Sequence, residues 1–214
     1  PMIFRSSIKN KSMKICVFLT SSTEIDEIYQ NATAELAKQA AERGHEIVFG
    51  GTEYGLMKVF ADNYKANGGK QLIGVLAEDL IAVTKNYKIH PLLDQQILTP
   101  NMGERKNTML AEADAFIALP GGYATFEELC TAMGARINKL FDKPVAVANI
   151  NGYYDDFLAQ MKKVHEQKFS KIPSDDAVFS SKDPSEILSY FENYKHREMP
   201  DKFVTNNNPF TKKS

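Results

Sequence analysis

The sequence predicts an α/β fold in which a mostly parallel sheet is flanked by helices. Short apolar runs alternate with longer stretches whose apolar residues recur at helical spacing, as expected for parallel strands joined by crossover helices. Segments rich in glycine and hydroxyl residues follow several apolar runs, which is typical of turns from strand to helix. The sequence shows no internal repeat and no linker, so we expect a single domain over residues 14–195.

Six strands are expected from short apolar runs that are bounded by polar or glycine-containing segments. In order along the chain they are residues 14–20, 46–49, 71–76, 96–98, 114–119 and 144–150. Residues 77–91 mix apolar and charged side chains, so no element is assigned there.

Helices are expected between these strands, where apolar residues repeat every three or four positions. Their approximate ranges are 25–40, 55–68, 101–113, 123–141, 153–168 and 184–194. Gly44 closes the first helix and Pro184 lies in the first turn of the last one, positions that suit these two residue types.

Composition excludes several classes of protein. The 214 residues carry a formal net charge of -1, too small to supply the phosphate attraction of a nucleic-acid binder. No apolar run approaches the roughly 20 residues of a membrane span. The two cysteines form no disulfide framework, and they and the four histidines show no spacing of metal ligands. We therefore expect a cytoplasmic protein without metal, nucleic-acid or membrane partners.

The two ends of the chain differ from the domain between them. Residues 1–13 lack the continuous apolar stretch of a secretion signal, and we interpret them as a loose leader. Residues 196–214 include three consecutive asparagines and have little to bury, which predicts a disordered tail.

Three loops after expected strands are suited to holding a phosphate. They are residues 20–22 (TSS), 50–55 (GGTEYG) and 120–125 (PGGYAT). Glycines allow main-chain amides to approach an anion, and a helix start adds partial positive charge. The alternative is that such residues only satisfy turn chemistry. No G-x-G-x-x-G follows the first strand and no G-K-[ST] occurs, so an NAD dehydrogenase and a P-loop NTPase are disfavoured.

Charged residues lie near the third of these loops. Glu128 is one turn from Thr125 and shares its helix face, whereas Glu127 is interpreted more simply as a carboxylate favoured by the helix dipole. Arg105 and Lys106 come early in the preceding helix, where they either reach the same crevice or form a solvated face. The histidines suggest no catalytic triad.

Two spaced motifs carry a resemblance to a known family. Residues 102–106 (MGERK) and 120–128 (PGGYATFEE) closely resemble the paired M-x-x-R-K and P-G-G-x-G-T-x-x-E motifs of the Lonely-guy family. Members of that family are cytokinin riboside 5'-monophosphate phosphoribohydrolases, often mislabelled lysine decarboxylases. The resemblance covers roughly residues 14–194.

This resemblance implies a Rossmann-like, doubly wound fold and a homodimer. It also implies hydrolysis of the N-glycosidic bond of a nucleoside 5'-monophosphate, of the AMP or N6-substituted AMP type, to free base and ribose 5-phosphate without a cofactor. Arg105 and Glu128 match the family's catalytic pair. The positions that match its substrate-binding residues are Ser21, Ser22, Glu78, Lys106, Gly121, Gly122, Tyr123, Ala124, Thr125, Phe126 and Glu127.

The chain departs from the family pattern at Thr20, Thr52, Lys58 and Ala124, where the family usually has glycine. At Ala124, a methyl group would be strained if the main chain there required a positive φ. These departures leave two hypotheses open. The first is a nucleotide phosphoribohydrolase, and the alternative is a protein of the same fold that binds or senses nucleotides without turning them over.

Overall fold

The computed structural model describes residues 12–200, so the expected leader and tail lie largely outside the described residues. These residues form a seven-stranded sheet of order β4-β3-β2-β1-β5-β6-β7 in which all neighbours run parallel. The strands are β1 Lys14–Phe18, β2 Glu46–Phe49, β3 Leu72–Ala77, β4 Gln95–Thr99, β5 Ala115–Ala118, β6 Val145–Ala148 and β7 Phe179–Ser181. The strand order reverses between β1 and β5, where doubly wound folds bind ligands.

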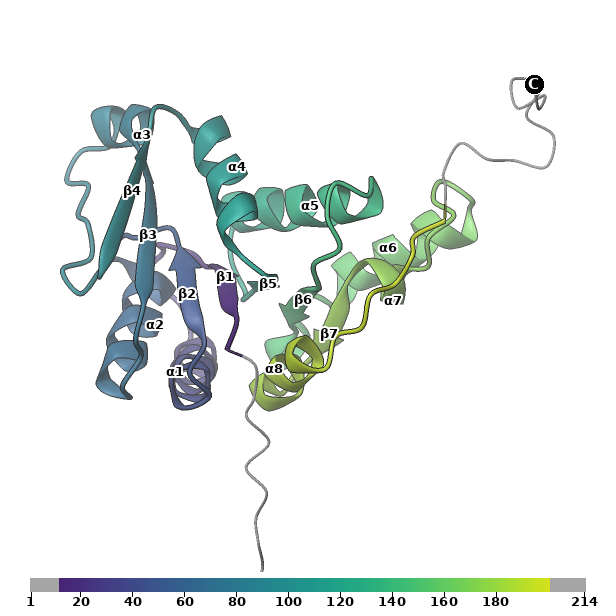
Figure 1. Ribbon diagram of the computed structural model, residues 1–214, viewed down its shortest axis with the longest axis horizontal. Coiled ribbons are helices and arrows are strands. Elements are labelled where there is room, and N and C mark those ends of the chain that lie inside the picture. The colour runs from purple at the N-terminus through teal and green to yellow at the C-terminus, as the bar shows by residue number, and fades with distance from the viewer. Residues whose placement is uncertain (1–11, 201–214) are drawn as a thin grey trace, which may run out of the picture.

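Helices cover both faces of the sheet, which confirms the predicted fold class (Figure 1). The helices of the described residues are α1 Glu27–Glu42, α2 Gly55–Ala66, α3 Glu78–Val83, α4 Met102–Glu112, α5 Tyr123–Ile137, α6 Asp155–Glu166, α7 Ser174–Ala177 and α8 Pro184–Glu192. A 3-10 turn, Ile150–Gly152, precedes α6.

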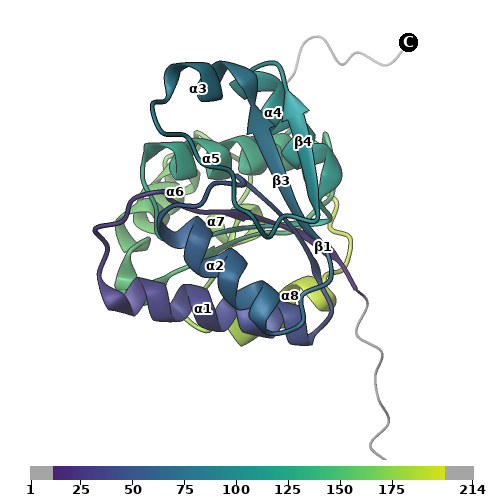
Figure 2. The same ribbon diagram turned by 90° about the vertical axis from the view of Figure 1, so that its left-hand side faces the viewer.

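Alternate residues of each central strand contribute to two separate cores. In β1, Ile15 and Val17 pack with α1, α2 and α8, whereas Cys16 and Phe18 pack with α4 and α5. Figure 2 shows these two groups of helices on opposite sides of the sheet. Because the strands are buried on both faces, they appear in the sequence as continuous apolar runs rather than as alternating ones.

The structure differs from the sequence-based expectation in four elements. The first helix, α1, begins at Glu27, so residues 19–26 form a longer loop than expected after β1. The unassigned segment after β3 contains the short helix α3, and neither β7 nor α7 was predicted. The elements α3, α7 and β7 have at most six residues each, too few to produce a recognisable periodicity.

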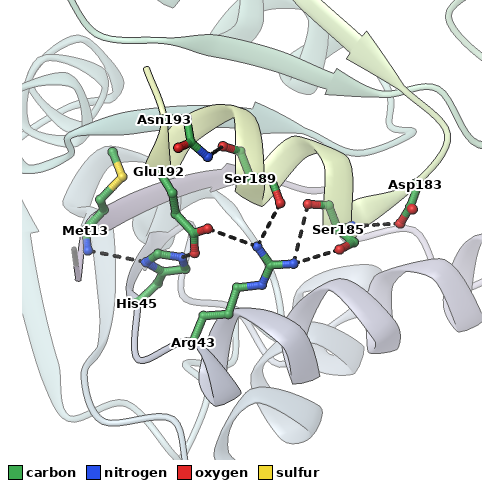
Figure 3. Close-up of polar contacts among 8 residues, drawn as sticks. All are labelled: Met13, Arg43, His45, Asp183, Ser185, Ser189, Glu192 and Asn193. Carbon is green, nitrogen blue, oxygen red and sulfur yellow. Dashed lines mark hydrogen bonds and ion pairs between the residues drawn. The ribbon is translucent and has the colours of Figure 1, made fainter. Parts of the chain in front are cut away.

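The amino end of the sheet is joined to α8 by a partly buried polar network (Figure 3). His45 accepts at Nδ1 from the main-chain nitrogen of Met13 over 3.3 Å, and its Nε2 lies 3.1 Å from Oε1 of Glu192. Arg43 donates to the other carboxylate oxygen of Glu192 over 3.1 Å and to the hydroxyl of Ser185 over 2.7 Å. The network links the ends of α1 and α8 to β2, on the side of the sheet away from the carboxyl ends of its strands.

Residues 196–200, which the sequence assigns to the tail, lie against the domain. Met199 is buried in the same core as Cys16 and Phe18 of β1, and Arg197 forms an ion pair with Asp176. His196 likewise contacts the carboxylate of Asp142. Within the described residues, this segment therefore packs on the domain through both apolar and charged side chains.

Candidate active site

A cavity of about 560 Å³ lies at the carboxyl ends of the central strands. It is lined by segments that follow five successive strands: Leu19–Ser21 after β1; Thr52, Tyr54 and Met57 after β2; Leu80 and Thr84–Tyr87 after β3; Met102 and Arg105 after β4; Gly122–Thr125 and Glu128 after β5. All three loops that the sequence suggests for phosphate binding contribute to it. The cavity lies at the point between β1 and β5 where the strand order reverses, which is where doubly wound sheets usually bind their ligands.

Arg105 and Glu128 form a buried ion pair in the wall of this cavity. Arg105 lies near the start of α4 and Glu128 near the start of α5. Nη1 of Arg105 donates to Oε1 of Glu128 over 2.9 Å, and Nε donates to the main-chain oxygen of Val75 over 2.8 Å. Only 5% of Arg105 and 7% of Glu128 are exposed. Contacts to both β3 and α5 therefore fix the guanidinium in one orientation.

The environment of Glu128 pulls its ionisation in two directions. Burial raises the pKa of this carboxyl above its ordinary value, because the charged form loses hydration, while the charge and hydrogen bond of Arg105 oppose the rise. A carboxylate and a guanidinium thus lie in contact at one desolvated wall. Such a pair can stabilise positive and negative charge that develops at neighbouring atoms of a substrate.

The first turn of α5 presents free main-chain donors to the cavity. Its N-cap is Gly122, and no side chain caps the helix. At the neighbouring helix α4, by contrast, Asn101 accepts from the amide of Glu104 over 2.9 Å and Asp79 accepts from that of Met102 over 3.1 Å. Because unpaired amides and the helix dipole attract anions, α5 is the better of these two sites for a phosphate.

Ala124 is accommodated without strain. It is the second residue of α5 and does not adopt a positive φ. Because the main chain does not require a positive φ at this residue, the methyl group of Ala124 does not strain the loop. Its side chain is exposed at the cavity, so it adds apolar surface there without displacing the main chain.

The loops after β1 and β2 are packed tightly against each other. The amide of Leu56 donates to the main-chain oxygen of Thr20 over 3.0 Å. Gly55 has a φ of +54°, and a Cβ atom on it would lie 2.2 Å from the main-chain oxygen of Ser22. A glycine is required at residue 55 on both counts. Ser21 lines the main cavity, whereas Ser22 lines an adjoining hollow of about 250 Å³.

Seven of the thirteen predicted site residues line the main cavity. They are Ser21, Arg105, Gly122, Tyr123, Ala124, Thr125 and Glu128. Gly121 lines the adjoining hollow with Ser22 and lies so close to Thr125 that a Cβ atom would be 2.3 Å from its hydroxyl oxygen. This contact explains why a glycine precedes Gly122 in the loop.

The other four predicted residues lie beside the cavity rather than in its lining. Lys106 and Glu127 pair with each other at the surface, one residue beyond Arg105 and one before Glu128. Phe126 stacks on Tyr153 with ring centroids 6.3 Å apart and packs against the α5 core. Glu78 is exposed at the start of α3.

Several lining residues were not among the predicted site residues. Met57 and Leu80 contribute apolar surface together with Tyr54 of the expected loop 50–55, and residues 84–87 form a further wall of the cavity. This wall lies in the segment that shows no periodic pattern, so no sequence signal marks it. Within the described range 12–200, no group of three or more His, Cys, Asp or Glu side chains is arranged to hold a metal ion, and no helix has the length and apolar character of a membrane span.

Two kinds of comparison with known proteins, by family model and by individual relatives, indicate the same family. The family model described as "Possible lysine decarboxylase" matches residues 57–191. Cytokinin riboside 5'-monophosphate phosphoribohydrolase LOG2 of Arabidopsis thaliana is 32% identical over 201 residues, which are 93% of this chain and 92% of that protein. The probable phosphoribohydrolase LOGL5 of Oryza sativa subsp. japonica is 35% identical over 185 residues, or 85% of this chain and 72% of that protein.

Solved structures share the architecture at lower identity. The molybdenum cofactor carrier protein of Chlamydomonas reinhardtii aligns with a TM-score of 0.61 and 21% identity, covering 84% of this chain and 95% of that chain. A molybdenum cofactor binding protein from Rippkaea orientalis gives a TM-score of 0.61, 21% identity and coverage of 84% and 94%. At these identities the similarity concerns the fold alone.

Proposed function

The chain belongs to the Lonely-guy family, whose family model carries the description "Possible lysine decarboxylase". We propose that it hydrolyses the N-glycosidic bond of a nucleoside 5'-monophosphate. The products are a free base and ribose 5-phosphate, and the AMP type of substrate is favoured. Relatives that align with most of this chain are named phosphoribohydrolases, and this supports the reaction class. The observation that carries the proposal is the buried Arg105–Glu128 pair beside the uncapped start of α5.

The phosphate is bound at α5 in this proposal. The amides of Tyr123, Ala124 and Thr125 are unpaired within the helix, as in any first turn, and no side chain caps them. The hydroxyl of Thr125 lies beside Gly121 in the same loop. Anchoring the 5'-phosphate here leaves the ribose within reach of Glu128, which is one helical turn beyond Thr125.

The chemistry requires the bond between C1' of ribose and a nitrogen of the base to break. The base leaves with the bonding electron pair and gains a proton, while water supplies that proton and the hydroxyl that joins C1'. Positive charge develops on the ribosyl group in between. The Glu128 carboxylate stabilises this charge and binds the ribose hydroxyls, and Arg105 anchors the substrate and stabilises the leaving side.

A product screen tests the proposal. The full chain is incubated with AMP, an N6-substituted AMP and the other common nucleoside monophosphates, and chromatography measures free base and ribose 5-phosphate. We expect base release from at least one purine monophosphate. Calorimetry with the same nucleotides distinguishes the hydrolase from the alternative. Tight binding with no base released at high protein concentration would indicate a nucleotide-binding protein instead of a hydrolase.

A further inference from the structure

We propose that His90, which does not line the cavity, is a positioning residue that fixes the cavity wall formed by residues 84–87 and thereby sets the choice of base. This inference rests on the proposed function. It concerns how the site distinguishes one nucleotide from another rather than how the bond is broken.

The wall is the part of the cavity left for the base. A phosphate at the start of α5 and a ribose beside Arg105 and Glu128 direct the base away from α5. The surface on that side comes from Tyr54, Leu80 and residues 84–87. Tyr87 lines the same cavity as Arg105 and Glu128, so the wall and the catalytic pair face one space. Burial raises the pKa of the Tyr87 phenol, and the charge of Arg105 opposes that rise.

Residues 84–90 are attached to the rest of the domain through the loop after β2. The amide of Glu53 donates to the main-chain oxygen of Lys88 over 3.0 Å, and the amide of His90 donates to that of Gly51 over 2.9 Å. Between them, Thr52 and Ile89 form an antiparallel bridge. The hydroxyl of Tyr54 donates to the main-chain oxygen of Asn86 over 2.6 Å, which ties the wall itself to the same loop.

The His90 side chain is the buried end of this attachment. Only 1% of the residue is exposed, although the residues on both sides of it are exposed. Its Nδ1 accepts from the amide of Leu92 over 3.2 Å, which assigns the ring proton to Nε2. Nε2 lies 3.2 Å from Oδ1 of Asp62 on α2. The ring thus places the end of residues 84–90 against α2, although Nε2 makes no hydrogen bond with the Asp62 carboxylate.

The two side-chain contacts of His90 have unequal weight. Asp62 is also paired with Lys58 over 2.7 Å, but both of these side chains are more than two-fifths exposed, and exposed ion pairs contribute little. The bond from Leu92 is shielded by the buried ring. We therefore expect acceptance of the Leu92 amide to matter more than the contact with Asp62. Lys58 is one of the positions where the chain departs from its family pattern, so this arrangement need not be shared by other members.

Three substitutions at residue 90 separate these contacts. His90→Asn retains an acceptor for the amide two residues ahead, as in an Asx turn, but does not reach Asp62. His90→Gln reaches Asp62 but loses the Leu92 bond, and His90→Leu loses both. His165→Leu, on α6, is the matched control because its ring bonds the main chain of Ser170 and does not line the cavity.

Kinetics with AMP and UMP measure the choice of base. We expect His90→Leu and His90→Gln to raise KM for the preferred nucleotide about 10-fold and to reduce the AMP-to-UMP ratio of kcat/KM by a similar factor, while kcat stays within about threefold. His90→Asn should restore both values to within about threefold of the parent. Unchanged KM and ratio in all three variants would overturn the proposal, as would equal losses for both nucleotides.

Limited trypsin digestion provides a second measurement that does not depend on turnover. The stretch 84–90, which includes the wall, contains Lys85 and Lys88, and both are exposed. If His90 fixes this segment, His90→Leu and His90→Gln should be cleaved after these lysines faster than the parent, the Asn variant and the His165→Leu control. Equal cleavage of all five proteins would contradict the role of His90. By contrast, a parent protein that releases no base would count against the proposed function alone.

Discussion

Gly50 leaves the guanidinium of Arg105 the space that it occupies. A Cβ atom at residue 50 would lie 2.6 Å from Nη2 of Arg105 and 2.9 Å from the terminal carbon of Met57. Gly50 does not have a positive φ, so a glycine is needed here for space and not for its main-chain freedom. The loop after β2 thus helps to position Arg105 without accepting a hydrogen bond from it.

Gly50→Ala should therefore lower activity by displacing Arg105. The methyl group forces the guanidinium or Met57 to move, and any shift weakens the bonds of Arg105 to Val75 and Glu128. We expect kcat/KM for the preferred nucleotide to fall about 10- to 100-fold, with a loss of roughly 1–3 kcal/mol in the free energy of unfolding from overpacking. Steady-state kinetics and urea denaturation measure the two effects.

Gly134→Ala is the control for this substitution. Gly134 lies within α5, and a Cβ atom there would meet nothing within 4 Å. Alanine should stabilise the helix by about 0.5–1 kcal/mol and leave kinetics unchanged. If Gly50→Ala behaved like this control, the close approach of Gly50 to Arg105 would have no functional consequence.

Glu128→Gln tests the proposed role of the carboxylate. Glutamine retains an oxygen that accepts from Arg105 but carries no charge to stabilise a positive ribosyl group. We expect kcat to fall about 100- to 1000-fold while nucleotide affinity changes much less. Since burial raises the pKa of Glu128, the parent should also lose activity at a higher pH than an ordinary carboxylate would predict, and the variant should lack this acidic limb.

The neighbouring Glu127→Gln is the matched control. Its carboxylate pairs with Lys106 at the surface and does not line the cavity. We expect kcat within about twofold of the parent, because an exposed ion pair contributes little. Equal losses from both substitutions, or proportional losses of affinity and rate at Glu128, would assign Glu128 a binding or structural role instead.

The central strands could be predicted because they are buried on both faces. A run such as CVF in β1 needs apolar side chains toward both helix layers, so burial leaves a direct trace in the sequence. The edge of the sheet leaves a weaker trace. β7 has three residues and two of them are serines, which is why it was missed. Gly44 ends α1 with a φ of +77°, as the sequence predicts.

The site could be predicted only where motif residues act locally. The start of α5 follows from its glycines, and Glu128 shares the face of Thr125 because the helix repeats every three to four residues. The wall at residues 84–87 depends on contacts with Gly51, Glu53 and Tyr54, more than thirty positions away in the chain. No local pattern encodes such contacts, so Tyr87 and His90 could be found only in the folded protein.

Ala124→Gly should not improve the protein. Since Ala124 lies in α5 without a positive φ, restoring the family's usual glycine relieves no strain. It removes a helix-favouring residue, and we expect the free energy of unfolding to fall by about 0.5–1 kcal/mol with kcat/KM within about twofold of the parent. Thermal denaturation and kinetics test this expectation. A 10-fold gain in kcat/KM would show that the methyl group obstructs the substrate.

Buried histidines should make stability depend on pH near neutrality. Burial lowers the pKa of His45 below its ordinary value of 6.5, and it also lowers that of His90, although Glu192 and Asp62 respectively oppose the change. Both rings accept a main-chain N–H at Nδ1, so a second ring proton would also break that bond.

The sign of this effect follows from proton binding. Just below pH 6.5 an unfolded chain protonates these histidines while the folded chain does not, so the unfolded state holds more protons. The free energy of unfolding should therefore fall as pH decreases from about 7, by up to about 1.4 kcal/mol for each histidine and each unit of difference between its two pKa values. Urea denaturation between pH 7.5 and 5.5 measures the slope.

Removing the titrating rings should flatten that slope. His45→Asn and His90→Asn each replace the ring with a neutral acceptor at the corresponding position, and the double variant should lose more of the dependence than either single one. His165→Asn controls for the loss of an imidazole, because His165 lies on α6 and bonds neither Glu192 nor Asp62. If the double variant kept the slope of the parent, the two buried histidines would not govern stability in this range, because the two proteins differ only at these positions.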